Sequence, residues 1–238
     1  MTDTPLPTAL VTGGARGLGA AIVRDLARDH RVVFTYRGAA APAAALAAEL
    51  PGALALPADF ADPAVPEALI ARTLDATGRL DLLVNAAGTV EEEDPLAFDL
   101  ASAERQMRIN ALAPAALMAA AGRLMPAGGA VVNVTSVNAT FPPAGAVTYG
   151  ASKAALENYT RGFAKALGPR GIRVNAVAPG AVERAHAPRS ADRLQAFLDE
   201  TALGALATPE DIAQAVRFLA TAPGVTGTIL PVSRGFRL

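Results

Sequence analysis

The feature that most constrains this chain lies near its N-terminus, where a short apolar stretch runs into a cluster of glycines. The apolar stretch is Ala-Leu-Val at residues 9–11, and the glycines are Gly13, Gly14, Gly17 and Gly19. Apolar residues at helical spacing then continue over residues 20–28. This order predicts a strand, a tight turn and a helix. Because glycines let backbone N–H groups approach a phosphate at the helix N-terminus, the unit is typical of a phosphate-binding turn.

Short apolar segments recur along the rest of the chain and alternate with helical patterns. The predicted strands are residues 9–11, 31–36, 53–56, 80–85, 130–135, 172–177 and 228–232. Continuous apolar runs such as Leu82-Leu83-Val84 suit strands that are covered on both faces. We therefore expect one α/β domain over residues 1–238, a doubly wound, mostly parallel seven-stranded Rossmann sheet with helices on both faces.

Four polar residues in the second half of the chain suit proton transfer: Asn110, Ser136, Tyr149 and Lys153. Tyr149 and Lys153 are four positions apart, so on a helix they share one face. A neighbouring ammonium favours ionisation of a phenol, whose pKa is otherwise about 10. Taken singly, Ser136, Lys153 and Asn110 also fit structural or solvated roles. Their joint spacing favours an acid–base site.

These motifs, in this order, resemble the short-chain dehydrogenase/reductase family in its classical form, in particular its 3-oxoacyl-ACP reductases. The family's Thr-Gly-x-x-x-Gly-x-Gly element stands at residues 12–19 and its Asn-Ala-Ala-Gly element at residues 85–88. Its catalytic Ser stands as Ser136, and its Tyr-x-x-x-Lys element occupies residues 149–153. The resemblance continues through residues 173–180 and ends near Gly227, so it covers nearly the whole chain.

The resemblance implies an oxidoreductase, a ketone reductase or alcohol dehydrogenase that transfers a hydride between a nicotinamide and a carbonyl or secondary alcohol. Tyr149 would be the general acid in reduction, and Ser136 would donate a hydrogen bond to the substrate oxygen. Lys153 would tune Tyr149 and bind the nicotinamide ribose. Asn110 would hold a water that links Lys153 to solvent.

The end of the second predicted strand bears on the choice between NAD and NADP. An acidic side chain there would accept the ribose 2′-hydroxyl of NAD, but this chain has Tyr36 and Arg37. Arg16 in the glycine turn offers a second guanidinium for a phosphate. Either arginine alone fits a solvated role, but together they favour NADP(H) over NAD(H). Asp59 resembles the family residue that contacts the adenine amine, and its alternative role is to cap a helix beginning near Pro63.

The cofactor residues implied by the resemblance are Gly13, Arg16, Gly17, Leu18, Gly19, Tyr36, Arg37, Asp59, Phe60, Asn85, Ala86, Gly88, Tyr149, Lys153, Pro179, Gly180 and Val182. Within this set, Asn85 is expected to bridge strands beneath the cofactor. Gly88 is expected to leave room beside the nicotinamide.

The chain departs from the family pattern after Gly180. Where the family has a Thr that binds the nicotinamide carboxamide, this chain has Arg184, so backbone groups of Val182 are expected to hold that carboxamide. Residues 181–206 are the predicted substrate lid, which carries four basic residues: Arg184, His186, Arg189 and Arg193. The alternative is a solvated face of arginines. Near the C-terminus, Val-Ser-Arg-Gly at residues 232–235 replaces the family's Val-Asp-Gly-Gly.

Composition and charge exclude other classes. The absence of Cys and the presence of only two His argue against a transition-metal site, so no metal is predicted. A net charge of −1 gives no field for nucleic acid. No apolar run reaches the roughly 18 to 20 residues of a membrane span, and the N-terminus lacks a signal-peptide pattern, so a cytoplasmic enzyme with a small-molecule substrate is expected.

The predicted helix that carries Tyr149 continues with further apolar residues, Leu156, Tyr159 and Phe163. In the family this helix packs against its counterpart in another subunit. The resemblance therefore implies a homotetramer, with a dimer as the next expectation.

Two other functions fit this fold. A non-catalytic regulator that senses NADP would be marked by loss of Tyr149 or Lys153, and both are present. A lyase of the halohydrin dehalogenase type resembles the family but replaces the Lys with Arg and disrupts the glycine turn. Lys153 and the intact glycines argue against that lyase.

Overall fold

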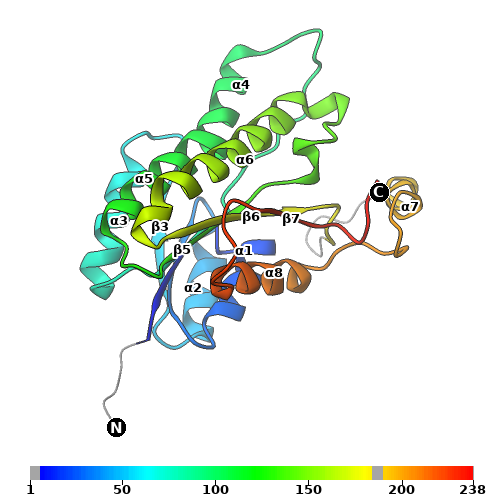
Figure 1. The fold of residues 1–238 in the computed structure, drawn as a ribbon. Coiled ribbons are helices and arrows are strands. Elements are labelled where there is room, and N and C mark those ends of the chain that lie inside the picture. The colour runs from blue at the N-terminus through cyan, green and yellow to red at the C-terminus, as the bar shows by residue number, and fades with distance from the viewer. Residues whose placement is uncertain (1–5, 184–189, 238) are drawn as a thin grey trace.

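Seven parallel strands form the centre of the molecule (Figure 1). The computed structural model describes residues 6–183 and 190–237, and all statements below concern these residues. The strands are β1 (Thr8–Thr12), β2 (Arg31–Tyr36), β3 (Leu54–Pro57), β4 (Leu82–Asn85), β5 (Ala130–Val134), β6 (Arg173–Pro179) and β7 (Ile229–Val232). They lie in the order β3-β2-β1-β4-β5-β6-β7, and each neighbouring pair is parallel. The expected seven-stranded, doubly wound sheet is confirmed.

Helices cover both faces of the sheet, as Figure 1 shows. One face packs against α1 (Gly17–Leu26), α2 (Ala40–Glu49) and α8 (Pro209–Thr221). The other packs against α3 (Val65–Thr77), α5 (Ala113–Leu124) and α6 (Val147–Leu167). A π-helical turn (Arg108–Leu112) joins α4 (Leu100–Met107) to α5, and α7 (Ala191–Asp199) lies near the C-terminus. None of the helices in the described part of the chain is long and apolar enough to cross a membrane.

The core continues through the sheet because side chains of a strand alternate between its two faces. In β1, Ala9 and Val11 join the core beneath α1 and α8, while Leu10 joins the core beneath α3 and α5. All five residues of β1 are buried. This double burial explains why the strand segments read as continuous apolar runs rather than alternating ones.

The strand order reverses between β1 and β4, and this reversal positions the site. Thr12 at the end of β1 pairs with Asn85 at the end of β4. The Thr12 hydroxyl oxygen accepts hydrogen bonds from the N–H groups of Ala86 and Ala87, both at 3.0 Å. The connections from β1 and β4 run to opposite faces of the sheet, which opens a crevice at the carboxyl ends of the strands.

Helix α1 begins earlier than the apolar pattern indicates, because it takes in the last glycines of the turn. The pattern predicts a helix over residues 20–28, whereas α1 is Gly17–Leu26. A Cβ atom at Gly19 would lie only 2.1 Å from the carbonyl oxygen of Gly13, so this close approach needs glycine. The glycine turn is therefore folded onto the first turn of the helix.

Gly14 lies beneath this turn and offers a test of its packing. A Cβ atom there would be 2.6 Å from Cβ of the buried Phe34 and 2.8 Å from Cγ2 of Val23. Because such overpacking forces the core to shift, we predict that Gly14→Ala lowers the free energy of unfolding by about 1–3 kcal/mol, measured by urea titration. Gly224→Ala is the control, since nothing lies within 4 Å of its added Cβ atom. Equal stability of the two variants would contradict this account.

Candidate active site

One continuous cleft follows the carboxyl ends of the strands and consists of two cavities. The first, of about 370 Å³, surrounds the glycine turn and is called the glycine-turn cavity. The second, of about 300 Å³, contains Tyr149 and is called the tyrosine cavity. The two cavities share lining residues, namely Gly17, Leu18, Ala86, Gly88 and Thr89. An elongated ligand can therefore occupy both.

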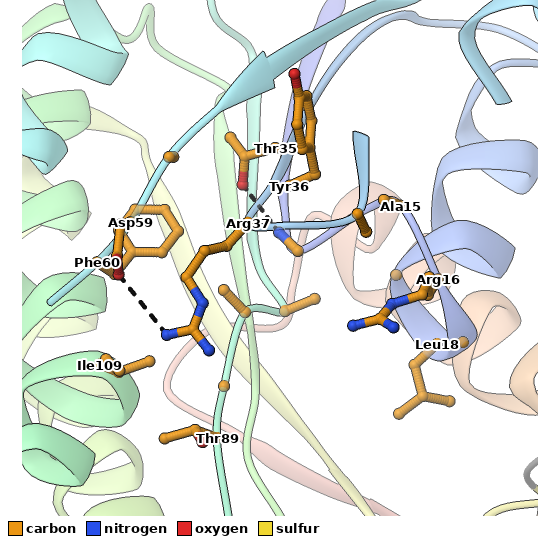
Figure 2. A pocket seen from close by; sticks show the side chains of 18 residues that line it. Ala15, Arg16, Leu18, Thr35, Tyr36, Arg37, Asp59, Phe60, Thr89 and Ile109 are labelled. Atoms are coloured by element: carbon orange, nitrogen blue, oxygen red, sulfur yellow. Dashed lines mark hydrogen bonds and ion pairs between the residues drawn. The ribbon is translucent and has the colours of Figure 1, made fainter. Parts of the chain in front are cut away.

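The glycine-turn cavity brings together most of the predicted cofactor residues (Figure 2). These are Gly13, Arg16, Gly17, Leu18, Gly19, Tyr36, Arg37, Asp59, Phe60, Ala86 and Gly88. The sequence motifs missed other lining residues: Ala15, Thr35, Ala39, Ala58, Ala87, Thr89 and Ile109. Thr35 also shapes the turn, because its hydroxyl oxygen accepts a hydrogen bond from Gly13 N–H at 3.0 Å. Its position near the carboxyl end of β2 could have identified Thr35 as a lining residue from the sequence, because ligands bind at the carboxyl ends of parallel strands.

Two arginines reach this cavity from different sides in Figure 2, Arg16 from the glycine turn and Arg37 from the end of β2. The Arg37 guanidinium lies 3.8 Å from the Asp59 carboxylate, with side-chain exposures of 61% and 53%. So exposed a pair contributes little to stability, and Arg37 stays available to an anion.

Asp59 does not cap the following helix. That helix, α3, begins at Val65, and Ala64 precedes it without a side-chain cap. The Asp59 carboxylate instead accepts a hydrogen bond from Ala61 N–H at 3.0 Å. The capping alternative for Asp59 is therefore wrong, and its carboxylate lines the cavity.

The tyrosine cavity collects the predicted catalytic residues Ser136, Tyr149 and Lys153. Ser136 follows β5, and the other two lie in the first turns of α6. Pro179, Gly180 and Val182 line the same cavity from the end of β6 and the residues after it. Further lining residues that the motifs did not single out are Thr89, Val90, Val134, Thr135 and Glu183.

Lys153 is a buried cation beside Tyr149. Its side chain is almost fully enclosed, and its ammonium donates a hydrogen bond to the Val134 carbonyl oxygen at 2.9 Å. The ammonium lies 5.7 Å from the centroid of the Tyr149 ring. Burial lowers the pKa of Lys153 to about 8, because the charged form loses its hydration. The Lys153 ammonium and the Tyr149 ring thus lie side by side in the tyrosine cavity.

Ser136 is buried at the start of a 3₁₀ turn, where its hydroxyl oxygen accepts a hydrogen bond from Asn138 N–H at 3.1 Å. A hydroxyl has one proton and two acceptor positions, so this bond uses an acceptor position of Ser136 and not its proton.

Asn110 stands behind the cleft rather than in its lining. It lies in the π-helical turn, and its amide exchanges two hydrogen bonds of 2.8 Å with the backbone of Thr89. Its amide nitrogen also donates to the Ser152 hydroxyl at 3.0 Å, and that hydroxyl donates to the Tyr149 carbonyl oxygen at 2.7 Å. Asn110 therefore joins a wall of the cleft to α6, which matches the structural alternative given for it above. Its water-holding role stays a prediction.

Asn85 and Gly88 act from beneath and beside the cleft. The Asn85 amide donates to the side-chain oxygen of Asn133 on β5 at 2.8 Å, so Asn85 bridges two strands as expected and lies outside the lining. A Cβ atom at Gly88 would come within 3.3 Å of Asn110 Oδ1 and 3.4 Å of Lys153 Nζ. These two side chains therefore lie against Gly88, which itself lines both cavities.

Part of the predicted lid lies outside the described residues, including Arg184, His186, Arg189 and the side chain of Arg193.

The departure from the family pattern at the C-terminus has a structural account. Arg234 adopts a left-handed conformation, with φ 57, and its guanidinium contacts the Asp211 carboxylate at 2.6 Å. Asp211 belongs to the capping box of α8, so Arg234 ties the C-terminal turn to that helix.

The sheet and its cleft define an α/β protein built for a dinucleotide, with a tyrosine–lysine pair at one end. A family model described as Enoyl-(Acyl carrier protein) reductase matches residues 13–237. The chain is 37% identical to the cyclic-di-GMP-binding biofilm dispersal mediator protein of Escherichia coli (strain K12), over 96% of each chain. It is 34% identical to the 3-oxoacyl-[acyl-carrier-protein] reductase of Synechocystis sp., over 99% of this chain and 98% of the relative.

Solved structures agree with these relatives. A blue fluorescent protein from a metagenomic library, in complex with NADPH, has a TM-score of 0.92 and 39% identity, covering 98% of both chains. A short chain dehydrogenase from Burkholderia cenocepacia J2315, in complex with NADP, has a TM-score of 0.89 and 35% identity, covering 96% of this chain and 97% of that one. The chain therefore belongs to the short-chain dehydrogenase/reductase family of oxidoreductases.

Burial of Lys153 predicts a pH-dependent stability. Its pKa is about 8 in the folded chain against an ordinary value of 10.5. Between these values the unfolded chain binds more protons, so the free energy of unfolding rises with pH. Relative to Lys153→Met, the wild type should gain about 2 kcal/mol between about pH 7.5 and pH 9.5. Urea titrations without cofactor measure this, with Lys165→Met on the exposed side of α6 as control. A difference that stays constant with pH would contradict the burial.

Proposed function

We propose that this protein is an NADP(H)-dependent carbonyl reductase and secondary alcohol dehydrogenase. The observation that carries the proposal is the meeting of Ser136, Tyr149 and Lys153 in a cavity continuous with the glycine-turn cavity. The NADPH and NADP complexes of the similar structures support the choice of cofactor.

The described residues fit NADP(H) along the whole cleft. Only glycine fits at residue 13, since a Cβ atom there would lie 2.8 Å from Ala87 Cα. A turn without side chains would let a pyrophosphate approach its backbone closely. Arg16 and Arg37 would bind the 2′-phosphate, and Asp59 would accept a hydrogen bond from the adenine amine. At the other end, Lys153 would bind the nicotinamide ribose, and backbone groups of Val182 the carboxamide.

Bound NADPH would supply the hydride for reduction of a carbonyl carbon. Tyr149 donates its phenolic proton to the carbonyl oxygen in reduction and takes it back in oxidation. The ammonium of Lys153 stabilises the phenolate that remains, and the Ser136 hydroxyl donates a hydrogen bond to the same substrate oxygen. Residues 181–206 act as a lid that excludes water from this step.

Titration of the protein with NADPH and NADH by fluorescence, followed by NADPH consumption across a panel of carbonyl compounds, tests the proposal. The panel comprises ketones, diketones, sugars and β-ketoacyl thioesters, the last chosen because one relative is named a 3-oxoacyl-[acyl-carrier-protein] reductase. Tight NADPH binding with turnover of at least one class is expected.

A nucleotide-sensing regulator is the second candidate, favoured by the relative named a cyclic-di-GMP-binding biofilm dispersal mediator. Binding of NADPH without turnover of any panel member would favour this candidate over the enzyme.

We further propose that the enzyme is a homotetramer that pairs its α6 helices. Tyr159 and Phe163 lie on that helix with ring centroids 6.5 Å apart, and the Tyr159 side chain is partly exposed. Light scattering of the purified protein gives the mass that tests this assembly.

Replacement of the proposed acid tests the mechanism. Tyr149→Phe removes only the phenolic proton, so turnover should fall about 10²- to 10⁴-fold while the NADPH dissociation constant changes little. Tyr159→Phe removes the same hydroxyl ten positions along α6 and should leave turnover intact. Full activity of Tyr149→Phe would remove Tyr149 from the reaction.

Cofactor preference depends on Arg37 in this proposal. Arg37→Asp exchanges a phosphate-binding cation for a carboxylate, so the ratio of kcat/KM for NADPH to that for NADH should fall at least about tenfold. Arg31→Asp makes the same charge change at the opposite end of β2 and is the control. An unchanged ratio in Arg37→Asp would contradict the assignment of Arg37 to the 2′-phosphate.

A further inference from the structure

The helix that carries Tyr149 and Lys153 begins without a cap of its own. Helix α6 starts at Val147, and the preceding residue, Ala146, makes no side-chain capping hydrogen bond. The first turn of α6 also contains no acidic residue. The first N–H groups of a helix have no partner within it, and they are stabilised by an acceptor or a negative charge placed nearby.

A carboxylate from a distant segment takes this position. Glu93 lies between β4 and α4, 55 residues before the second residue of α6, Thr148. One Glu93 oxygen accepts a hydrogen bond from Thr148 N–H at 2.5 Å, and the other accepts from the Thr148 hydroxyl at 2.7 Å. Both bonds are charge-assisted, which makes them short and strong.

The segment around Glu93 is itself fastened at both ends. The backbone N–H of Glu93 donates to the carbonyl oxygen of Gly145, just before α6, at 3.0 Å. Two residues earlier, the Glu91 carboxylate accepts hydrogen bonds from the α4 side chains of Ser102 at 2.7 Å and Arg105 at 2.5 Å. Glu91 and Glu93 therefore hold this loop against α4 and the start of α6.

This segment also forms part of the wall of the cleft. Thr89 and Val90 line the tyrosine cavity, so a tether at Glu93 fixes the wall and the first turn of α6 relative to each other. Tyr149 follows Thr148 directly, and any fraying of that first turn moves its phenol. Small displacements of a reacting group are costly to a rate, since about 1 Å can lower it about 10²-fold.

We propose that Glu93 is a positioning residue for Tyr149: it caps the first turn of α6 from another segment and locks that turn to the wall of the tyrosine cavity. The rate consequence rests on the proposed function of Tyr149 as the proton donor. The cap and the tether do not, because they are contacts within the protein.

Glu93→Ala tests the proposal, with Glu92→Ala as the matched control, since Glu92 is the exposed neighbour with the same charge. Hydrogen exchange of the backbone amides of residues 148–150 should become about 5- to 30-fold faster in Glu93→Ala and stay unchanged in Glu92→Ala. For a carbonyl compound that the wild type turns over, kcat should fall roughly tenfold, while the NADPH dissociation constant stays the same. Glu93→Gln retains an oxygen for Thr148 N–H, so it should recover most of kcat.

Two results overturn the proposal: exchange in Glu93→Ala that matches Glu92→Ala, or faster exchange with an unchanged kcat. If Glu93→Ala does not fold, Thr148→Val takes its place, because it removes the hydroxyl bond to Glu93 and keeps the N–H bond. Its exchange should then rise and its kcat fall by smaller factors than those given for Glu93→Ala, and no change in either overturns the proposal. A wild type that turns over no carbonyl compound contradicts the proposed function instead. In that case the exchange comparison alone decides whether Glu93 caps and tethers α6.

Discussion

The reversal of strand order between β1 and β4 is the constraint on which the rest of this molecule depends. All seven strands of the described sheet are parallel, and its central strands are buried on both faces, so a ligand is confined to the ends of the strands. At the reversal, the connections leave toward opposite faces, and the hydroxyl of Thr12 holds the connection after β4 in place through two backbone N–H groups. The glycine turn, the basic residues of the first cavity and the polar residues of the second all open onto this one crevice.

The tyrosine end of the crevice is organised by contacts to a single helix. Lys153 fastens α6 to β5 through the carbonyl of Val134, Asn110 fastens it to Thr89 through Ser152, and Glu93 fastens its first turn. These contacts come from different segments, so several parts of the chain must be folded before Tyr149 reaches its place. Such preorganisation suits the proposed role of Tyr149 as a proton donor, because its geometry is then set before substrate arrives.

Much of this arrangement is predictable from sequence, because motifs with fixed spacing encode local geometry. The β2 segment was predicted with its observed bounds. The glycine turn and Ser136 follow strand ends, Tyr149 and Lys153 share one face of α6, and all of them meet along one cleft. The contacts that spacing does not encode were missed. The pairing of Arg37 with Asp59 and the bond between Glu93 and Thr148 join segments far apart in sequence, so they depend on how loops fold over the sheet. The partners of the Asn110 amide, Thr89 and Ser152, were missed for the same reason, and its water-holding role stays a prediction.

The amide pair beneath the cleft has a consequence for how the chain avoids folding errors. Asn85 and Asn133 are direct partners in the register of β4 and β5, and Asn133 also donates to the hydroxyl of Thr160 on α6 at 2.9 Å. The other residues of β4 and β5 are Val, Leu and Ala, and apolar side chains of similar size pack almost equally well in several registers of the two strands. A shifted alignment would bury an amide without its partner, at a cost of about 1–3 kcal/mol for each unsatisfied group. The hydrogen-bonded amides of Asn85 and Asn133 in this apolar layer thus favour the observed register of β4 and β5 over shifted registers during folding.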